Sequence, residues 1–352
     1  MERVYLDHNA TTPLCAEAKA AMIAAMEVAG NPSSVHAEGR LAKGLIERAR
    51  AQVAAALGAE GADIVFTSGA TEAASLAMAG RGLRVAGVEH DAVLAWGAGE
   101  RLAVDHAGRV TVEDPAGSCL QLANSETGVV QALPEGLAVT DLTQAFGKLP
   151  VAFNWLGAQM GIVSAHKLGG PKGIGALVLK RGTDLAAQLK GGGQEMGRRA
   201  GTENLIGIAG FGAAAEAAAR DLADGAWEPV RALRDRLEVL LAEGLAEMGE
   251  SPEIAGAGAD RLPNTTCVIT PGWKGETQVM QMDLAGFAVS AGSACSSGKV
   301  RASGVLRAMG YDEEAASGAL RVSLGTGTRP EDIERFARAW LAQRKKRRAR
   351  AA

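Results

Sequence analysis

Short apolar runs alternate with helix-like segments between about residue 40 and residue 250. The short runs predict strands, and each is followed by the Gly, Ser, Asn or Asp residues that commonly end a strand. These strands are expected at residues 64–66, 83–88, 119–122, 138–140, 162–164 and 176–179. Strands that alternate with crossover helices are typical of a largely parallel sheet. The pattern therefore predicts an α/β fold.

The clearest amphipathic helix is expected at about residues 229–248. Its apolar face carries Leu233, Leu237, Leu240, Leu241 and Leu245. Residues that break helices follow at 251–253 and 256–258, and a strand-like segment begins at residue 265. We therefore expect a domain boundary near residue 250, with this helix linking the two domains.

Length and composition fit an enzyme with one large domain and a smaller partner. The chain has 352 residues, of which 47% are hydrophobic. Its formal net charge of -3 gives no field that favours nucleic acid as a direct ligand. Basic residues do gather at 344–350, where we expect a solvated, frayed tail.

Neither a membrane segment nor a metal site is expected from the sequence. The first residues contain no apolar stretch like that of a signal peptide, and no later run has membrane-spanning length, which predicts a cytoplasmic protein. The four cysteines lie far apart without a Cys-x-x-Cys pair, so neither a disulfide framework nor a metal centre is indicated. Any one of them could be a free, reactive thiol.

A first candidate motif lies at residues 63–72, where a strand, a tight Gly turn and a helix start follow one another. Free backbone N–H groups, the helix dipole and the hydroxyls of Ser68 and Thr71 would converge on a phosphate there. The same residues also fit an ordinary helix N-cap, so the motif alone leaves both interpretations open.

A second candidate is Asp141, at the end of a predicted strand, with Gln144 three positions later. A buried carboxylate beside a protonated pyridine nitrogen keeps that nitrogen charged, which lets the ring accept electrons. Taken alone, the motif would be better explained by Asp141 capping the next helix.

The most specific feature is Lys167, which follows an apolar strand together with Ser164 and His166 and precedes a Gly-rich loop. Lysines prefer solvated helix faces, so a lysine in this position is better explained as an amine that forms an imine. This predicts a pyridoxal-phosphate enzyme whose cofactor is held as a Schiff base on Lys167.

Cys295 lies within a run of small residues at 289–298. Small neighbours leave a sulfur accessible, so we expect a reactive thiol on a mobile loop. Cys15, Cys119 and Cys267 lie among apolar or helical residues and are expected to have packing roles.

Taken together, these segments resemble the cysteine desulfurases, in the class V branch of the aspartate-aminotransferase fold of pyridoxal-phosphate enzymes. The resemblance runs nearly from end to end. It rests on motifs at residues 5–13, 30–36, 67–72, 89–90, 124–128, 141–144, 164–167, 199–202, 293–295 and 320–324. It implies a large cofactor-binding domain of residues 14–250, and a smaller α+β domain of residues 1–13 with 251–352.

The resemblance also implies roles for individual residues. Lys167 would bind the cofactor, Asp141 would pair with the pyridinium nitrogen, Gln144 would contact the ring hydroxyl and His90 would stack on the ring. The remaining cofactor contacts would come from Thr71, Ala70, Ser125, Ser164 and His166, and from Thr202 reaching the phosphate of the neighbouring subunit in a homodimer. Arg321, with its planar bidentate fork, would bind the substrate carboxylate together with Asn31.

The implied reaction converts L-cysteine to L-alanine. Lys167 would take the Cα proton, His90 would handle the thiol proton, and the Cys295 thiolate would attack the substrate sulfur. The resulting persulfide would pass to a sulfur-acceptor or scaffold protein, with iron–sulfur cluster assembly as the expected pathway.

Alternative functions are a selenocysteine lyase or another class V lyase or aminotransferase. A cofactor-binding subunit without activity is a further alternative.

Two departures from the family pattern stand out. Ser125 occupies a position where the family usually has a second asparagine. The segments 71–124 and 128–141 are short, which leaves little room for the usual crossover helices.

Overall fold

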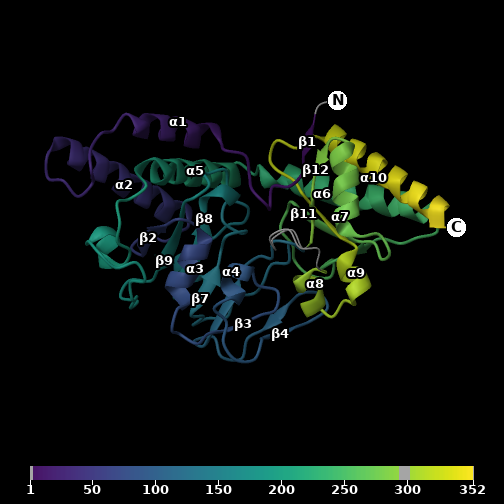
Figure 1. Cartoon of the computed structure of the whole chain (residues 1–352), viewed down its shortest axis with the longest axis horizontal. Coiled ribbons are helices and arrows are strands. Elements are labelled where there is room, and N and C mark those ends of the chain that lie inside the picture. The colour runs from purple at the N-terminus through teal and green to yellow at the C-terminus, as the bar shows by residue number, and fades with distance from the viewer. Residues whose placement is uncertain (1–2, 293–301, 352) are drawn as a thin grey trace.

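The computed structural model describes residues 3–292 and 302–351 and has an α/β fold (Figure 1). Its main sheet has the strand order β2-β9-β8-β7-β6-β3. These strands are β2 (Asp63–Thr67), β3 (Arg84–Val85), β6 (Ser118–Gln121), β7 (Val139–Asp141), β8 (Met160–Ser164) and β9 (Gly175–Leu179). The two pairings of β9 are antiparallel, and the other three are parallel.

All six predicted strands of this region are present, which confirms the expected α/β class. The prediction for residues 83–88 was too long, because β3 spans two residues. Ala86 then forms an isolated bridge to Leu102, and Gln121 and Asn124 donate side-chain hydrogen bonds to the carbonyl of Val88. Side chains therefore satisfy a backbone group that ladder bonds would have used.

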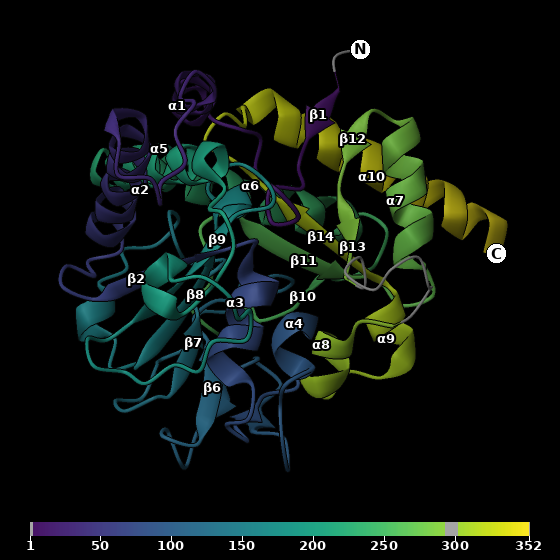
Figure 2. The ribbon, with the colours of Figure 1, turned by 60° about the vertical axis from the view of Figure 1, so that its left-hand side comes forward.

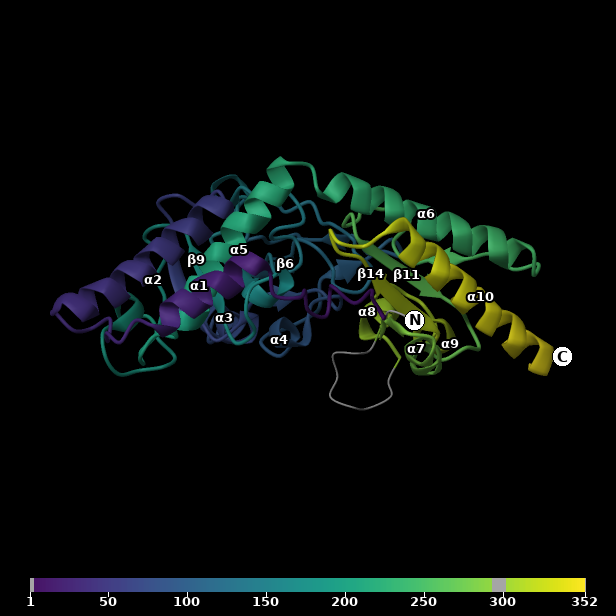
Figure 3. The same ribbon diagram turned by 90° about the horizontal axis from the view of Figure 1, so that it is seen from above.

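Successive side chains of a strand point to opposite sides of the sheet, and in the main sheet both sides are buried against packed layers. Ile64 and Phe66 of β2 pack in the layer that contains α2 (Ala37–Ala56) and α5 (Leu205–Ala223), with α1 (Ala16–Met26) lying outside on α5. Val65 instead faces α3 (Ala70–Met78). Figure 3 shows α1, α2 and α5 side by side over one half of the molecule.

The connections at the β3 edge of the sheet carry little helix. Residues 122–138, which join β6 to β7, contain no helix, and the β7–β8 connection has only the 3-10 turn η1 (Phe153–Trp155). Between β3 and β6 lie the short helix α4 (Asp91–Leu94) and the hairpin of β4 (Ala103–Val104) and β5 (Val110–Thr111). This agrees with the short segments found in the sequence.

A second sheet forms beside the first, in the order β10-β11-β14-β13 (Figure 2). Its antiparallel strands are β10 (Glu253–Ile254), β11 (Thr265–Ile269), β14 (Ala319–Ser323) and β13 (Ser290–Ala291). Nearby, β1 (Val4–Tyr5) pairs in parallel with β12 (Phe287–Ala288). The N-terminal strand therefore lies with elements from the last third of the chain.

The helices of this second unit are α6 (Trp227–Ala246), α7 (Gly275–Leu284), α8 (Gly304–Ala308), α9 (Glu313–Ser317) and α10 (Pro330–Ala351). Helix α6 packs beside α10, as Figure 3 shows, and its Leu237 and Leu241 join Phe336 and Trp340 in a second core. The boundary near residue 250 stays a prediction. Helix α6 lies before that predicted boundary, yet its apolar side chains pack in the core of the second unit.

The expectation of a frayed basic tail is wrong. Residues 344–350 belong to α10, and Arg344 and Arg348 both form ion pairs with Glu250. These pairs hold the end of the helix against the segment that follows α6. Among the described residues, we find no helix that combines the length and hydrophobicity needed to cross a membrane.

Candidate active site

The carboxyl ends of β2, β6, β7 and β8 meet at one edge of the main sheet, where ligands bind in open α/β folds. A cavity of about 530 Å³ opens there, a volume typical of a small-molecule site. Nine of the predicted residues line it: Ala70, Thr71, His90, Ser125, Asp141, Gln144, Ser164, His166 and Lys167. The fold thus brings together residues that the chain separates by almost a hundred positions.

One end of the cavity is built for an anion. Ser68, Gly69 and Thr71 lie where β2 passes into α3, so the first backbone N–H groups of this helix have no partner within it. A side chain on Gly175 of β9 would collide with Gly69, so glycine there lets the turn rest on the sheet. The Glu72 carboxylate accepts from the Ser68 N–H at 2.7 Å and fixes the turn.

Asp141 ends β7 and points into the cavity from the floor. Its Oδ1 accepts a hydrogen bond from the Thr143 N–H at 2.8 Å, a turn that Asp commonly forms with the residue two positions on. The Thr143 hydroxyl is buried and has no partner among the described residues. A carboxylate and an unsatisfied hydroxyl therefore face the same space.

Lys167 follows β8 in the single turn η2 (Ala165–Lys167). Its Nζ donates to the carbonyls of Asn9 at 2.6 Å and Ala10 at 2.9 Å, which belong to the N-terminal segment. The neighbouring His166 ring contacts Thr11 Oγ1 through Nδ1 at 3.2 Å. Burial, followed by the charges of Lys167 and Lys172, lowers the pKa of His166 to about 4, so this ring is neutral at pH 7.

His90 caps α4 and lines the same cavity as the turn before α3. Its Nδ1 accepts from the Ala92 N–H at 3.1 Å, so the proton of the neutral ring is on Nε2. Glu89 beside it is buried and lies near Asp141. Burial, with the Asp141 charge adding to it and the hydrogen bond from the Gln121 N–H opposing it, raises the pKa of Glu89 well above its ordinary value.

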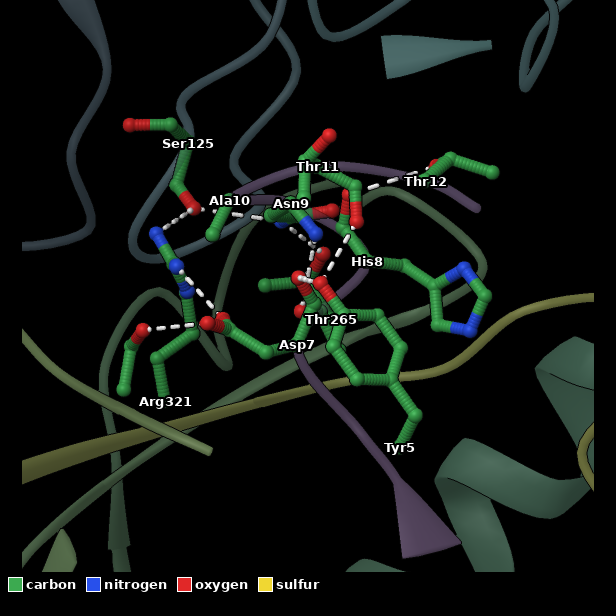
Figure 4. A network of polar contacts seen from close by, with 12 residues as sticks. Tyr5, Asp7, His8, Asn9, Ala10, Thr11, Thr12, Ser125, Thr265 and Arg321 are labelled. Carbon is green, nitrogen blue, oxygen red and sulfur yellow. Dashed lines mark hydrogen bonds and ion pairs between the residues drawn. The ribbon is translucent and has the colours of Figure 1, made fainter. Parts of the chain in front are cut away.

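The N-terminal segment 7–12 connects the two sheets at the cavity (Figure 4). Asn9 Nδ2 donates to the Ser125 carbonyl and to Thr265 Oγ1, while the Asn9 N–H donates to Ser323 Oγ. Arg321 of β14 donates to Asp7 Oδ1 at 2.8 Å and to the Ser125 carbonyl at 3.1 Å. This segment thereby links the large-domain cavity to β11 and β14.

Three predicted site residues do not line the cavity of their own chain. Arg321 is only 2% exposed, behind Ser125, with its Nε unpaired among the described atoms. Thr202 lines a neighbouring cavity of about 200 Å³ that shares Ser68 and Gly173 with the first. Asn31 lies exposed between α1 and α2, where its Oδ1 accepts from the Ser33 N–H.

Glu126 is buried beside Gly292 and Ser303, which flank the segment that contains Cys295. The Ser303 hydroxyl donates to Glu126 Oε2 at 2.6 Å, and a side chain on Gly292 would lie within 2.9 Å of the same oxygen. Burial raises the pKa of Glu126 to about 7, although the Ser303 hydrogen bond and the Arg321 charge oppose the rise.

The cysteines differ in their surroundings. Cys295 itself lies outside the described residues. Cys119 and Cys267 are fully buried, and burial raises the pKa of Cys267 to about 12. Cys15 is partly buried and caps α1 through its sulfur. Within residues 3–292 and 302–351, no cluster of His, Cys, Asp and Glu is arranged to hold a metal ion.

Sequence reasoning missed several residues of the site. Lys172, Thr143, Gln121 and Thr11 line the cavity, and the buried Lys148 contacts Gln144 from behind. The spacing of Lys148 four residues after Gln144 was a usable sign, because a turn that follows a strand brings such positions together. Nothing in the local sequence links Asn9 to Thr265 or Ser323.

Comparison with known proteins connects this geometry to one family. Residues 4–101 and 97–336 match the aminotransferase class-V family. The chain is 41% identical to a cysteine desulfurase of Cereibacter sphaeroides over 96% of this chain and 94% of that protein. It is 36% identical to cysteine desulfurase IscS 1 of Archaeoglobus fulgidus over 94% of each. A solved NifS-like protein of Rickettsia africae superposes with a TM-score of 0.86 at 30% identity, covering 97% of this chain and 100% of that one.

Proposed function

Because the chain belongs to the cysteine desulfurases of the aminotransferase class-V family, we propose that it uses pyridoxal 5'-phosphate to convert L-cysteine to L-alanine and collects the sulfur on Cys295. The observation that carries the proposal is the single cavity where Lys167, Asp141 and His90 converge with the anion-binding turn of α3. This donor set contains an amine, a carboxylate, an imidazole and a phosphate site, which are the groups such a cofactor needs.

The residues present fit this cofactor. The phosphate would lie at the α3 turn, held by Thr71 with Ser164 and His166, while Lys172 lines the same cavity. Asp141 would face the ring nitrogen with the oxygen that Thr143 leaves unused. The unpartnered Thr143 hydroxyl and the cavity volume of about 530 Å³ leave polar capacity and room for such a group. When bound, the cofactor supplies an electron sink for the bonds at the substrate Cα.

Proton transfer falls to Lys167 and His90. The Lys167 amine already lies at the cavity edge, held by the carbonyls of Asn9 and Ala10, so it can accept a proton from Cα without a long movement. His90 lines the same cavity with Nδ1 held by the Ala92 N–H, and would exchange the thiol proton of the substrate. The neutral His166 can donate one hydrogen bond to the phosphate.

Arg321 would recognise the substrate carboxylate. Its guanidinium already bonds Asp7 and Ser125, which leaves the buried Nε unsatisfied within the described structure. A carboxylate that approached past Ser125 would compete with Asp7 for the guanidinium. In the same proposal, Asn31 adds a second contact to the substrate.

Sulfur transfer needs a thiolate that reaches the substrate sulfur. The Cys295 thiolate forms a new S–S bond while the Cβ–S bond of the substrate breaks, and the electron pair of that bond stays with the carbon that becomes the alanine methyl group. The product is a persulfide on Cys295. Cys119 and Cys267 are unsuited because burial holds both thiols protonated.

The wider setting belongs to the same proposal. The enzyme would work in the cytoplasm as a homodimer in which Thr202 reaches the phosphate of the other subunit, and it would pass sulfur to an acceptor or scaffold protein for iron–sulfur cluster assembly. Thr202 lies outside the main cavity of its own chain, in an adjoining cavity that shares Ser68 and Gly173 with it.

Incubation of the cofactor-loaded protein with L-cysteine tests the proposal. We expect alanine in solution and, by peptide mass spectrometry, the added mass of one sulfur atom on Cys295. The C295A variant should form no protein persulfide, whereas C15A, which removes a partly buried thiol on α1, should behave as the unchanged protein. Full alanine turnover by C295A would exclude the persulfide route, and added sulfur on Cys15 alone would move the reaction to another thiol.

A further inference from the structure

Lys148 is a buried amine for which the proposed reaction has no use. Its side chain is 2% exposed, in the turn that follows β7. Its Nζ contacts Gln144 Oε1 at 2.7 Å, the Gln144 carbonyl at 3.3 Å and Asn9 Oδ1 at 3.4 Å. None of these described contacts is a carboxylate. Burying an ammonium group without an acid is costly, so its presence calls for a role.

The contact with Lys148 decides how the Gln144 amide is oriented. Lys148 Nζ donates to Gln144 Oε1 at 2.7 Å, and the Asn9 carbonyl on the other side of the amide can only accept, so both partners select the same orientation of the amide. The amide nitrogen then points the other way, where Nε2 donates to the Asn9 carbonyl at 3.0 Å. The second N–H of this amide finds no acceptor in the described part of the chain, and Gln144 lines the cavity.

Asn9 joins this arrangement to Lys167. Its carbonyl accepts both from Gln144 Nε2 and, at 2.6 Å, from Lys167 Nζ. Its Oδ1 accepts from Lys148 and from Asn264 Nδ2. The Lys167 amine and the Gln144 amide therefore bond the same carbonyl, so a movement of Gln144 changes the hydrogen bonding of Lys167.

The charges that face Lys148 are positive. Burial, followed by the charges of Lys167 and Arg321, holds the pKa of Lys148 well below its ordinary value, and Lys148 in turn contributes to lowering the pKa of His8. Negative charge on a ligand in the cavity would offset this repulsion. A ligand with an anionic oxygen near Gln144 would therefore reduce the repulsion among Lys148, Lys167 and Arg321.

We propose that Lys148 is a positioning residue that holds Gln144 Oε1 so that the amide N–H points at the ring hydroxyl oxygen of bound pyridoxal 5'-phosphate. This rests on the proposed function. A donor at that oxygen draws negative charge away from it and weakens its hold on the proton of the Lys167 nitrogen beside it. Loss of Lys148 therefore raises the pKa of that nitrogen.

The test is a spectroscopic pH titration of the cofactor-loaded protein without substrate. We expect the midpoint of the visible absorption change in K148M to rise by about one pH unit, which corresponds to losing one hydrogen bond to a charged acceptor. Q144A should show a similar rise. The double variant K148M/Q144A should rise no further than Q144A alone, since both changes remove the same contact. K43M, on the surface of α2, is the matched control for loss of a lysine charge.

The outcomes separate the two levels of the proposal. If the wild-type protein develops no visible band with pyridoxal 5'-phosphate, the proposed function itself is refuted. A normal band whose midpoint does not move in K148M would refute the role of Lys148 alone, as would a rise that adds fully to that of Q144A. If K148M does not fold, K148Q replaces it, because its amide can still donate, and it should shift the midpoint less than Q144A does.

Discussion

Replacement of Glu126 by Gln tests how this buried carboxyl affects the stability of the fold. In the folded chain the pKa of Glu126 is about 7, raised from 4.5 by burial. A carboxyl with a raised pKa contributes stability that is fully present below pH 4.5 and is lost as the pH rises through 7. Gln keeps the shape and can accept from Ser303, but it does not ionise.

The expected magnitude follows from the two pKa values. Their difference corresponds to about 3 kcal/mol of unfolding free energy, lost by the unchanged protein between about pH 4.5 and pH 8.5. The free energy of unfolding of E126Q, relative to the unchanged protein, should therefore rise by about 3 kcal/mol over this range. The comparison uses the change with pH, so any constant effect of the substitution cancels.

The measurement is equilibrium unfolding in urea at a series of pH values, with protein concentration and cofactor held constant. E60Q, at an exposed position after α2, serves as the control and should give a difference that does not change with pH. If the E126Q difference stays flat within about 1 kcal/mol, the Glu126 carboxyl does not ionise with a raised pKa and the reasoning from its burial fails.

Three further substitutions test other parts of the structure. K167A should abolish the visible band of the bound cofactor and lower alanine formation by at least about a thousandfold, measured by product analysis; retention of both would remove Lys167 from the reacting centre. D7N leaves the buried Arg321 without its carboxylate partner and should cost about 3 kcal/mol in urea unfolding, and a loss below about 1 kcal/mol would mean that the pair behaves as a solvated one. L237A should cost about 3 kcal/mol because it empties a fully buried position of the second core, whereas V239A, at a position 44% exposed on the same helix, should cost much less.

Elements with a regular apolar pattern could be predicted from the sequence. The strands that contain Val65, Ile162 and Leu177 are apolar on both faces, which is typical of strands covered on both sides of a sheet. The helix with Leu237 and Leu241 was also found, because its apolar positions recur at helical spacing. These predictions succeed because the pattern is local. The predicted strand at 83–88 was too long because side-chain hydrogen bonds to Val88 take the place of strand pairing.

The candidate site was predictable where a motif follows a strand directly. Asp141, Ser164 and Lys167 meet in the cavity for that reason. The network around Asn9 was not, since its partners Thr265 and Ser323 lie more than 250 residues away. Lys148 was overlooked because a lysine in a turn is usually solvated, and only the fold shows that Lys148 is buried and contacts Asn9.

Because the N-terminal segment packs with the second sheet, some of its contacts can form only late in synthesis. Residues 4–12 precede the whole main sheet in the chain, yet β1 pairs with Phe287–Ala288, and the Asn9 N–H donates to Ser323 Oγ. The large sheet needs nothing beyond residue 179 to pair its strands, so it can form early in translation. The N-terminal segment beside Lys167 therefore gains its contacts to β12 and β14 only after the strands of the main sheet have all been synthesised.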